Sequence, residues 1–436
     1  MGTFRWSMAS MAVLVGTVSY AQPTCGEWTA WPTDSPGSVS NILYDAAFTG
    51  PPVGLAVGSW NSGLGPQPLV QEWSGTGWSG LGLPDTSGLG TRPQVEGVGV
   101  AGGDLWVVGY VTTGYPTNYM PLVMRRQGGQ WDRVSTPTLR KQNTYPFADR
   151  GGFAYDIAGV SGDDMWVVGT AAGYGDASAT SVGLALHFDG SAWEDVDVPL
   201  VGNRHHELND VSASASDNVW AVGDWRSVAQ NFKALVVRWD GSQWHHVPNP
   251  GEGDAGGDAE CVVAFAPDDV WVSGNFNGGV DHLIHWNGSS WDVVDAGLPG
   301  PFAAFAATGP ADIWASCAIN ATIYHFDGSS WTPAGGPDIP GAEYVLRGWG
   351  LAAVGPCEVW SVGAWSDGVV QRTLAERLAP ALCAADFNGD TVVNTLDVLA
   401  FLNAYVGGDP RADFNGDTVV NTLDVLAFLN AYTAGC

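Results

Sequence analysis

One tryptophan-centred phrase recurs through most of the chain and limits the possible folds more than any other feature. It places the tryptophan in a short apolar run after an acidic or polar turn, as in "GDDMWVVG" and "PDDVWVSG". Six copies have their tryptophans at Trp106, Trp166, Trp220, Trp271, Trp314 and Trp360. A degenerate seventh copy, "PPVGLAVG", has Leu55 in that place. Repeats of this length indicate stacked or radially arranged copies of one supersecondary unit.

Each repeat divides into four short strands. A second phrase, such as "WDGSQW" or "FDGSSW", follows each of the first six copies and ends in Trp78, Trp131, Trp193, Trp244, Trp291 or Trp331. A tight turn such as Pro-Asp-Asp joins the first two strands, and a two-residue Asn-Gly or Asp-Gly connection is expected between the third and fourth. Four antiparallel strands make one propeller blade. The sequence therefore predicts an all-β, seven-bladed propeller over residues 22–379.

The seventh repeat lacks its own fourth strand, and the start of the mature chain supplies one. "CGEWTAWP", from Cys25 to Pro32, resembles the fourth-strand phrases of the other repeats. Closure of the ring between the two terminal strands leaves no open sheet edge. The repeats resemble the Trp-rich repeats of secreted bacterial β-propellers and, more distantly, kelch repeats. This resemblance implies an architecture and no particular function, because propellers host lyases, hydrolases and binding proteins.

Charge and targeting signals point to an exported protein. Residues 1–21 are predicted to be a signal peptide, with Arg5, an apolar run that ends at Val18, and small residues Ser19 and Ala21 before the cleavage point. No other stretch approaches the length of a transmembrane helix. The formal net charge of -29 argues against nucleic acid or an anionic membrane surface as a partner and favours a cation. We therefore expect a secreted or cell-surface protein.

Beyond Pro380 the tryptophans stop, and one 21-residue segment occurs twice, at residues 385–405 and 412–432. Each copy has oxygen-bearing residues at loop positions 1, 3, 5, 9 and 12 and a main-chain carbonyl at position 7, which is the layout of an EF-hand Ca²⁺ loop. The predicted ligands are Asp386, Asn388, Asp390, Val392, Asn394 and Asp397 in the first copy, and Asp413, Asn415, Asp417, Val419, Asn421 and Asp424 in the second. A helix follows each loop, with Leu399, Leu402 and Tyr405 on one face of the first.

The paired loop-and-helix segments resemble a type I dockerin, and the Gly-Cys ending resembles planctomycete-type dockerin-like tails. The resemblance implies a small α-helical domain at residues 380–436 that binds two Ca²⁺ ions and docks onto a cohesin-like protein or a cell-surface anchor. It also implies that loop positions 10 and 11 contact the partner. These positions are Thr395, Leu396, Thr422 and Leu423.

Two departures from the EF-hand pattern predict modest calcium affinity. Thr391 and Thr418 occupy loop position 6, where glycine is usual because the backbone there favours positive φ, and a β-branched residue costs about 1 to 3 kcal/mol in that conformation. Asp397 and Asp424 at position 12 are shorter than the usual glutamate, which reduces their reach for bidentate contact.

Six cysteines in an exported chain predict disulfides. A bridge between Cys383 and Cys436 would close a loop of about 53 residues around the tail and stabilise it by about 4 kcal/mol. The alternative is a free terminal thiol used for intermolecular linkage or anchoring. The pairs expected for the other four are Cys25 with Cys357 and Cys261 with Cys317.

Aromatic residues lie two positions after the glycine that ends several second strands. They are Trp60, Trp225, Phe276 and Trp365. These residues either form stacking platforms for sugar rings on one propeller face or cover the neighbouring blade. The histidines are dispersed over the blades without a catalytic motif, so we assign them structural or surface roles and assign no catalytic residue. The acidic loop that ends at Glu260 is either a further cation site or a solvated loop.

Three functions are compatible with the sequence. The favoured one is a secreted, non-catalytic binding or scaffold protein that is docked or anchored through the calcium-dependent tail. The first alternative is a dockerin-bearing carbohydrate-active enzyme, a polysaccharide lyase or glycosidase, with its site on the propeller face. Clustered carboxylates or a His-Tyr-Arg set at one mouth of the channel would favour that alternative. The second is a structural surface protein without a ligand.

Overall fold

The computed structural model divides the chain into two compact units, one of residues Cys25–Ala379 and one that holds Pro380–Cys436. The structure describes residues 25–50, 53–83, 90–113, 118–137, 139, 151–172, 181–202, 205–226, 231–253, 255–317, 319–380, 385–389 and 393–434. The predicted signal peptide, Cys383, Cys436, and the first-loop residues Asp390, Thr391 and Val392 lie outside these ranges.

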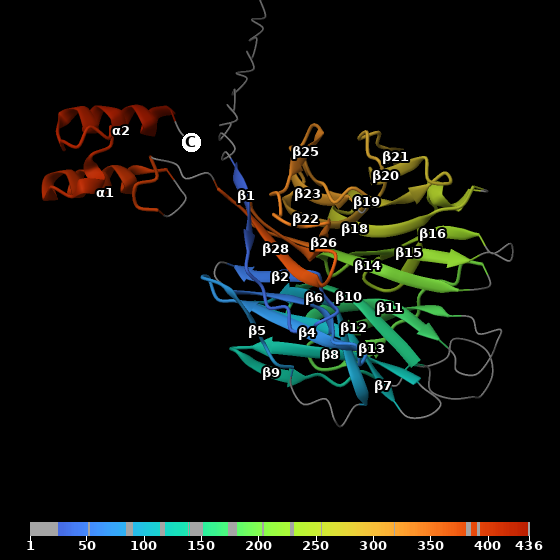
Figure 1. The fold of residues 1–436 in the computed structure, drawn as a ribbon. Coiled ribbons are helices and arrows are strands. Elements are labelled where there is room, and N and C mark those ends of the chain that lie inside the picture. The colour runs from blue at the N-terminus through green and yellow to red at the C-terminus, as the bar shows by residue number, and fades with distance from the viewer. Residues whose placement is uncertain are drawn as a thin grey trace, which may run out of the picture. The chain divides into compact units, whose positions relative to one another are not determined.

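The first unit is a ring of seven four-stranded antiparallel sheets, which confirms the predicted seven-bladed β-propeller (Figure 1). Blade 1 is β2 (Ser40–Gly50), β3 (Val53–Asn61), β4 (Pro66–Trp73) and β5 (Trp78–Gly80). Blade 2 is β6 (Thr91–Ala101), β7 (Asp104–Thr113), β8 (Asn118–Gln127) and β9 (Gln130–Arg133). Blade 3 is β10 (Gly151–Ser161), β11 (Asp164–Ala172), β12 (Val182–Phe188) and β13 (Trp193–Asp195).

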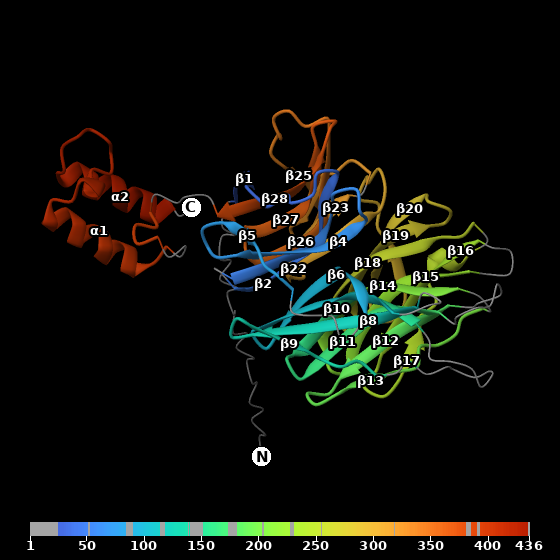
Figure 2. The same cartoon turned by 60° about the horizontal axis from the view of Figure 1, so that its bottom comes forward.

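The remaining blades follow the same up-and-down order around the ring (Figure 2). Blade 4 is β14 (His206–Ala215), β15 (Asn218–Arg226), β16 (Phe232–Trp239) and β17 (Trp244–His246). Blade 5 follows the short 3-10 helix η1 (Pro250–Glu252) and is β18 (Asp258–Ala266), β19 (Asp269–Phe276), β20 (Asp281–Trp286) and β21 (Trp291–Val293). Blade 6 is β22 (Phe302–Gly309), β23 (Asp312–Cys317), β24 (Ile323–Phe326) and β25 (Trp331–Gly335).

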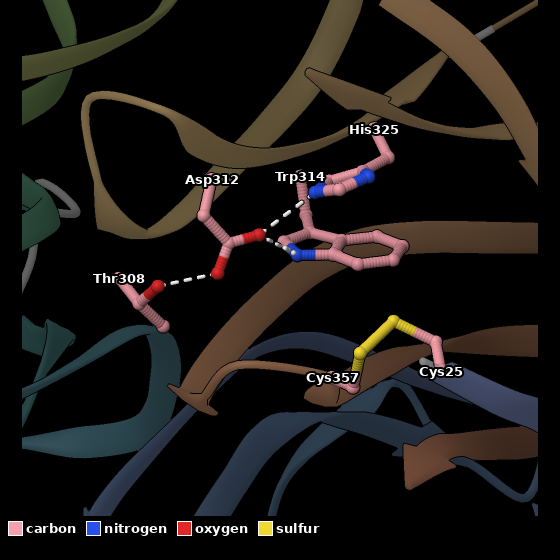
Figure 3. Close-up of a disulfide and its surroundings, with 6 residues drawn as sticks. All are labelled: Cys25, Thr308, Asp312, Trp314, His325 and Cys357. Atoms are coloured by element: carbon pink, nitrogen blue, oxygen red, sulfur yellow. Dashed lines mark hydrogen bonds and ion pairs between the residues drawn. A yellow bond between two sulfur atoms is a disulfide. The ribbon is translucent and has the colours of Figure 1, made fainter. Parts of the chain in front are cut away.

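Blade 7 is built from both ends of the propeller, as the sequence predicted. Its strands β26 (Tyr344–Gly355), β27 (Glu358–Ser366) and β28 (Gln371–Pro380) are completed by β1 (Cys25–Trp31), which lies beside β28. The predicted disulfide between Cys25 and Cys357 is confirmed and joins β1 to the turn between β26 and β27 (Figure 3). The terminal strand is therefore held by backbone pairing and by a covalent link.

The predicted bridge between Cys261 and Cys317 is wrong. Both are buried free thiols in the core between blades 5 and 6. Each sulfur is directed at a main-chain carbonyl instead of at the other sulfur: Cys261 Sγ lies 3.5 Å from the oxygen of Phe302, and Cys317 Sγ lies 3.8 Å from the oxygen of Gly300. The blade alignment placed the two residues near the same face correctly, but it did not determine the directions of their side chains.

The repeated tryptophans pack in the interfaces between blades, and a histidine or arginine on the third strand covers each ring. In blade 6, Asp312 Oδ1 accepts a hydrogen bond from Trp314 Nε1 at 2.9 Å and lies 2.8 Å from His325 Nε2, and the imidazole stacks on the indole with ring centroids 4.1 Å apart (Figure 3). His187 and His285 repeat the contact with an aspartate and the stacking, on Trp166 and Trp271. These three histidines therefore have structural roles.

Arginine replaces histidine in the other intact repeats. The guanidinium groups of Arg125, Arg238 and Arg377 lie 5.2, 5.7 and 5.7 Å from the ring centres of Trp106, Trp220 and Trp360. Ring stacking and cation–π contact both use the face of an otherwise buried indole.

In five blades the connection between third and fourth strands is longer than the predicted two-residue turn, whereas blade 2 has a two-residue connection of Gly128 and Gly129. In blade 4, Trp239 pairs directly with Trp244, which leaves four residues in the connection. The side chain of Asp240 accepts hydrogen bonds from the backbone N–H groups of Ser242 and Gln243 at 2.8 and 2.9 Å. This aspartate-capped turn explains why Asp-Gly recurs there without forming a tight two-residue hairpin.

The second unit contains two helices of equal length, α1 (Thr395–Gly407) and α2 (Thr422–Ala434), with the 3-10 helix η2 (Pro410–Ala412) between them. Asn394 caps α1 by accepting a hydrogen bond from the backbone N–H of Leu396, and Gly408 ends it at φ 67°. The core is the face-to-face pair Phe401 and Phe428, whose ring centroids are 4.2 Å apart. The helices therefore pack through their phenylalanines.

Candidate functional site

A cavity of about 560 Å³ occupies the centre of the propeller and is lined by the first strands of the blades. Each first strand shows a register shift against its second strand, which leaves one residue without a partner in six blades and three residues, 347–349, in blade 7. One unpaired residue of each first strand lines the cavity. These residues are Tyr44, Glu96, Tyr155, Asn209, Glu260, Ala303 and Trp349. The bulges thus present one ring of side chains to the channel.

In six blades a glycine at the end of the second-strand phrase makes room for the bulge, and blade 6 has Cys317 at that position. A Cβ atom on Gly109 or Gly223 would lie 2.1 Å from the carbonyl oxygen of Gln94 or Glu207, two residues before the bulged residue. No side chain can be accommodated at that distance. The glycine of the recurring "WVVG" phrase therefore marks the strands that have an inward-pointing residue opposite them. The sequence alone does not show this role, because it depends on how the two strands pair.

Three aspartates follow the bulged residues and link neighbouring blades. The Oδ2 atoms of Asp45, Asp156 and Asp210 accept hydrogen bonds from backbone N–H groups of the next blade at 2.8, 2.9 and 2.6 Å. Burial, followed by the charge of Asp156, raises the pKa of Asp45 to about 8. Burial and Asp156 also raise the pKa of Asp210 well above its ordinary value. These carboxyl groups hold the ring together at the channel wall.

A second set of acidic residues lies nearer the end of the channel where the first strands begin. Burial raises the pKa of both Glu96 and Glu260 to about 7. Burial and the neighbouring Glu207 raise the pKa of Asp224 to about 6. Glu207 itself has a lowered pKa, mainly because of its hydrogen bond with His205, and it is also hydrogen-bonded to Tyr155. No Lys, Arg or His occurs among the described residues that line the cavity.

Aromatic side chains surround the same end of the channel. Tyr44 stacks with Trp349 at a centroid distance of 5.7 Å, and the Trp349 side chain remains 45% exposed. Phe153 contacts Tyr110 and Tyr155 with centroids 4.8 and 6.2 Å apart. An acidic channel with accessible aromatic faces suits a ligand that carries positive charge or several hydroxyl groups.

The aromatics predicted to form sugar platforms lie away from this channel. Phe276 is fully buried in the core, Trp60 and Trp225 pack against core clusters, and none of the three lines the central cavity. Trp365 lines a separate cavity of about 380 Å³ together with Arg372. Trp365 is therefore the best placed of the four for contact with a ligand.

The predicted calcium loops show several features that fit a bound cation. In the second loop, Thr418 adopts φ 72°, the conformation expected at loop position 6. Asp413 Oδ2 accepts a hydrogen bond from the N–H of Thr418 at 2.8 Å, while Asp413 Oδ1 is buried and has no hydrogen-bond partner. Asp424, at position 12, accepts hydrogen bonds from the N–H groups of Asn415 and Asn421. An orphaned carboxylate oxygen in an oxygen-rich loop is chemically suited to Ca²⁺.

The described part of the first loop repeats this pattern. Asp397 accepts hydrogen bonds from the N–H groups of Asn388 and Asn394 at 3.0 and 2.8 Å, and Asp386 accepts one from Gly389 at 2.9 Å. Within the described ranges, no three His, Cys, Asp or Glu side chains converge as a metal-binding group. The predicted ligand sets differ from such a group because they also use asparagine and main-chain carbonyl oxygens.

The two tail helices leave equivalent apolar side chains exposed. Thr395 and Thr422, at the predicted partner-binding positions, are also exposed. On α1, Leu396, Leu399 and Leu402 are 56, 56 and 41% exposed. The corresponding values on α2 are 58, 56 and 41% for Leu423, Leu426 and Leu429. We call these six residues the leucine stripes.

Comparison with known proteins supports the fold alone. No protein-family model and no curated protein matches the chain. The solved structure of YCF48 bound to D1 peptide matches with a TM-score of 0.50 and 14% identity, over 82% of this chain and 99% of that one. YCF48 from Cyanidioschyzon merolae matches at 0.48 and 16% identity, over 82% and 100%. A streptogramin B lyase matches at 0.48 and 12% identity, over 80% and 97%. At these identities the chain shares a β-propeller fold with these proteins and no family is assigned.

Proposed function

We propose that the protein is an exported, non-catalytic binding protein whose propeller recognises a ligand at the channel and whose C-terminal unit docks it through two Ca²⁺-dependent loops. The partner of the tail is a cohesin-like protein or a cell-surface anchor. The Cys25–Cys357 disulfide supports export because disulfides persist in oxidising compartments. No helix in the described ranges is long and apolar enough to cross a bilayer.

The leucine stripes are the observation that carries the docking role. Six leucines on two short helices are between 41 and 58% exposed, although a small unit gains stability by burying such side chains. Exposed apolar patches of this kind mark protein interfaces. Because the two copies expose matching residues to matching extents, either copy offers the same surface, and one partner is expected to bind in two orientations.

Calcium would be held by the oxygen atoms of the two loops. In the second loop these belong to Asp413, Asn415, Asp417, Val419, Asn421 and Asp424. The ion would neutralise their charge and satisfy the orphaned oxygen of Asp413. The loop precedes the first turn of α2, so a rigid loop would also hold the exposed leucines near that turn in a fixed position.

Calorimetric titration of the full-length protein with Ca²⁺ tests this proposal. Two sites are expected, and Asp413→Ala is expected to remove one of them, whereas Asp132→Ala in blade 2 is a charge-matched control that leaves both. Binding to an immobilised cohesin panel should require Ca²⁺ and be lost when Leu399 and Leu426 are both replaced by glutamate. Absence of heat together with unchanged circular dichroism on adding Ca²⁺ would contradict the tail assignment.

A carbohydrate-active enzyme is the second candidate, and the acidic end of the channel favours it. Paired carboxyl groups supply the acid and base for glycoside cleavage, and here Glu207 is hydrogen-bonded to Tyr155 close to Glu260. Incubation with a polysaccharide panel should release reducing or unsaturated ends if the site is catalytic, and Glu207→Gln should abolish the release. A glycan array that shows binding without product formation would favour the binding protein, and an array without any signal would favour a structural role.

A further inference from the structure

Five carboxylates form an acidic arc, interrupted at blade 3 by Tyr155, at the end of the channel where the first strands begin. They come from β6 in blade 2, β14 and β15 in blade 4, and β18 in blade 5. The arc consists of Glu96, Glu207, Asp224, Asp258 and Glu260. The charges of Asp258, Asp224 and Glu207 all act on Glu260, and Glu96 acts on Tyr44 and Tyr155. The carboxylates and tyrosines at this end of the channel therefore interact electrostatically.

Asp224 provides an independent sign of a missing partner. Its side chain is only 8% exposed, and its Oδ1 atom is buried without a hydrogen bond. Trp220 and Val222, on the same side of β15, pack against blade 5. Asp224 therefore points toward β18, which carries Asp258 and Glu260. A buried carboxylate oxygen without a donor is costly unless a ligand supplies one.

Three basic side chains lie near the arc. His205 lies between the hydroxyl of Ser181 and the carboxylate of Glu207, to which its Nε2 lies at 3.0 Å. The guanidinium of Arg226 stacks 4.1 Å from the ring centre of Phe232, its Nε is buried without a hydrogen-bond partner, and its charge acts on Glu207 and Asp224. Lys233 donates to main-chain carbonyls of the η1 segment. The five carboxylates of the arc therefore outnumber the basic groups beside them.

The spacing of the arc suits an extended organic cation better than a metal ion. No three acidic, His or Cys side chains converge as a metal-binding group among the residues described. The channel end adds the stacked faces of Tyr44 and Trp349, and the Trp349 side chain is 45% exposed. Aromatic faces attract cations, and an ammonium group also donates hydrogen bonds to carboxylates.

We propose that the acidic arc binds a ligand with a protonated primary amine, which donates to Asp224 and Glu260 while its carbon chain lies against the tyrosine and tryptophan faces. This inference rests on the proposed function, because it names the ligand class of the propeller site. A quaternary ammonium lacks N–H donors and leaves Asp224 unsatisfied. Free polyamines, lysine side chains and amino sugars share the required chemistry.

Calorimetry on the full-length protein at low ionic strength tests the proposal with spermidine, a lysine-containing peptide and a glucosamine oligomer as separate arms. At least one arm should bind saturably, and the arm with the highest affinity identifies the source of the amine. Asp224→Asn and Glu260→Gln should each weaken that binding by about tenfold or more, because each removes a charge-assisted hydrogen bond. Glu194→Gln, on the exposed edge strand of blade 3, is the matched control and should leave affinity unchanged.

Two results would overturn the proposal. One is the absence of saturable binding in all three arms. The other is binding that tetramethylammonium reproduces equally well and that neither arc variant changes, which would mean diffuse attraction to an acidic protein. Glu260→Gln alters a channel-facing side chain, so it remains informative if Asp224→Asn fails to fold. If no amine binds but the protein binds glycans or docks in a Ca²⁺-dependent way, the amine proposal fails and the proposed function stands.

Discussion

The disulfide between Cys25 and Cys357 offers the sharpest test of how the propeller ring is held closed. It links residues 332 apart in the sequence and anchors β1, the seven-residue strand that completes blade 7. Replacing both cysteines by serine leaves β1 attached through its pairing with β28, the packing of Trp28 and Trp31 against neighbouring aromatic rings, and a side-chain hydrogen bond from Thr29 to the Arg377 carbonyl. We expect the double variant to fold and to be markedly less stable.

The magnitude follows from the length of the closed loop. Chain-entropy arguments give a stabilisation of about 6 kcal/mol for a loop of several hundred residues. Because the unfolding entropy grows with chain length, 1 kcal/mol corresponds to about 1 to 2 °C for a unit of this size, so the melting temperature should fall by about 6 to 12 °C.

Thermal unfolding with and without reductant measures this effect. The wild-type protein should lose stability on reduction, and mass spectrometry after alkylation should show that Cys25 has been released. The double variant is the control: the buried thiols of Cys261 and Cys317 form no bridge, so any effect of reductant that remains in it reports the predicted Cys383–Cys436 bridge of the tail. An unchanged melting temperature in a wild-type protein whose Cys25 is fully alkylated would refute the reasoning and assign ring closure to strand pairing alone.

Three further predictions concern the tail core, the channel wall and the second calcium loop. Phe401→Ala should destabilise the tail by about 3 to 5 kcal/mol, measured by helical circular dichroism, whereas Leu399→Ala on the exposed face should change it by less than about 1 kcal/mol. Because burial and Asp156 raise the pKa of Asp45 to about 8 from about 4 in the unfolded chain, its stabilising contribution is present at acid pH and lost as the pH rises through about 8. Melting curves from pH 5 to 9 should show this loss, Asp45→Asn should reduce it, and a flat wild-type profile would contradict it. Thr418→Gly should relieve the strain at φ 72° and tighten Ca²⁺ binding several-fold in calorimetric titration, and weaker binding would contradict an EF-hand conformation.

The sequence was sufficient for the blade count and for ring closure because both depend on local, repeated patterns. Six tryptophans and one leucine mark the seven second strands. The segment "CGEWTAWP" resembles the fourth-strand phrases and supplies the fourth strand that the seventh repeat lacks. The Cys25–Cys357 pair, one of the two pairs expected for the four remaining cysteines, is confirmed. The expected Cys261–Cys317 pair failed because blade alignment places residues at one end of the ring without specifying the direction of each side chain.

In the tail, the sequence placed the loops and helices but left open which helix face is buried. Leu399, Leu402 and Tyr405 repeat on one side of α1, and Phe401 lies between them. A helix with apolar residues around much of its circumference can pack in several ways. The second helix decides the outcome, because stacking of Phe401 on Phe428 turns the leucines outward.

The channel site is the part that only tertiary structure decided. Glu96, Glu207 and Glu260 are separated by more than 50 residues from one another in the sequence, and each precedes or occupies a bulge that interrupts the simple alternation of a strand. Sequence alternation predicts which side chains face a neighbouring blade. It does not reveal the one-residue register shift that turns a side chain into the channel, because that shift arises from close pairing with a glycine on the second strand, and closure of the ring then brings these carboxylates together.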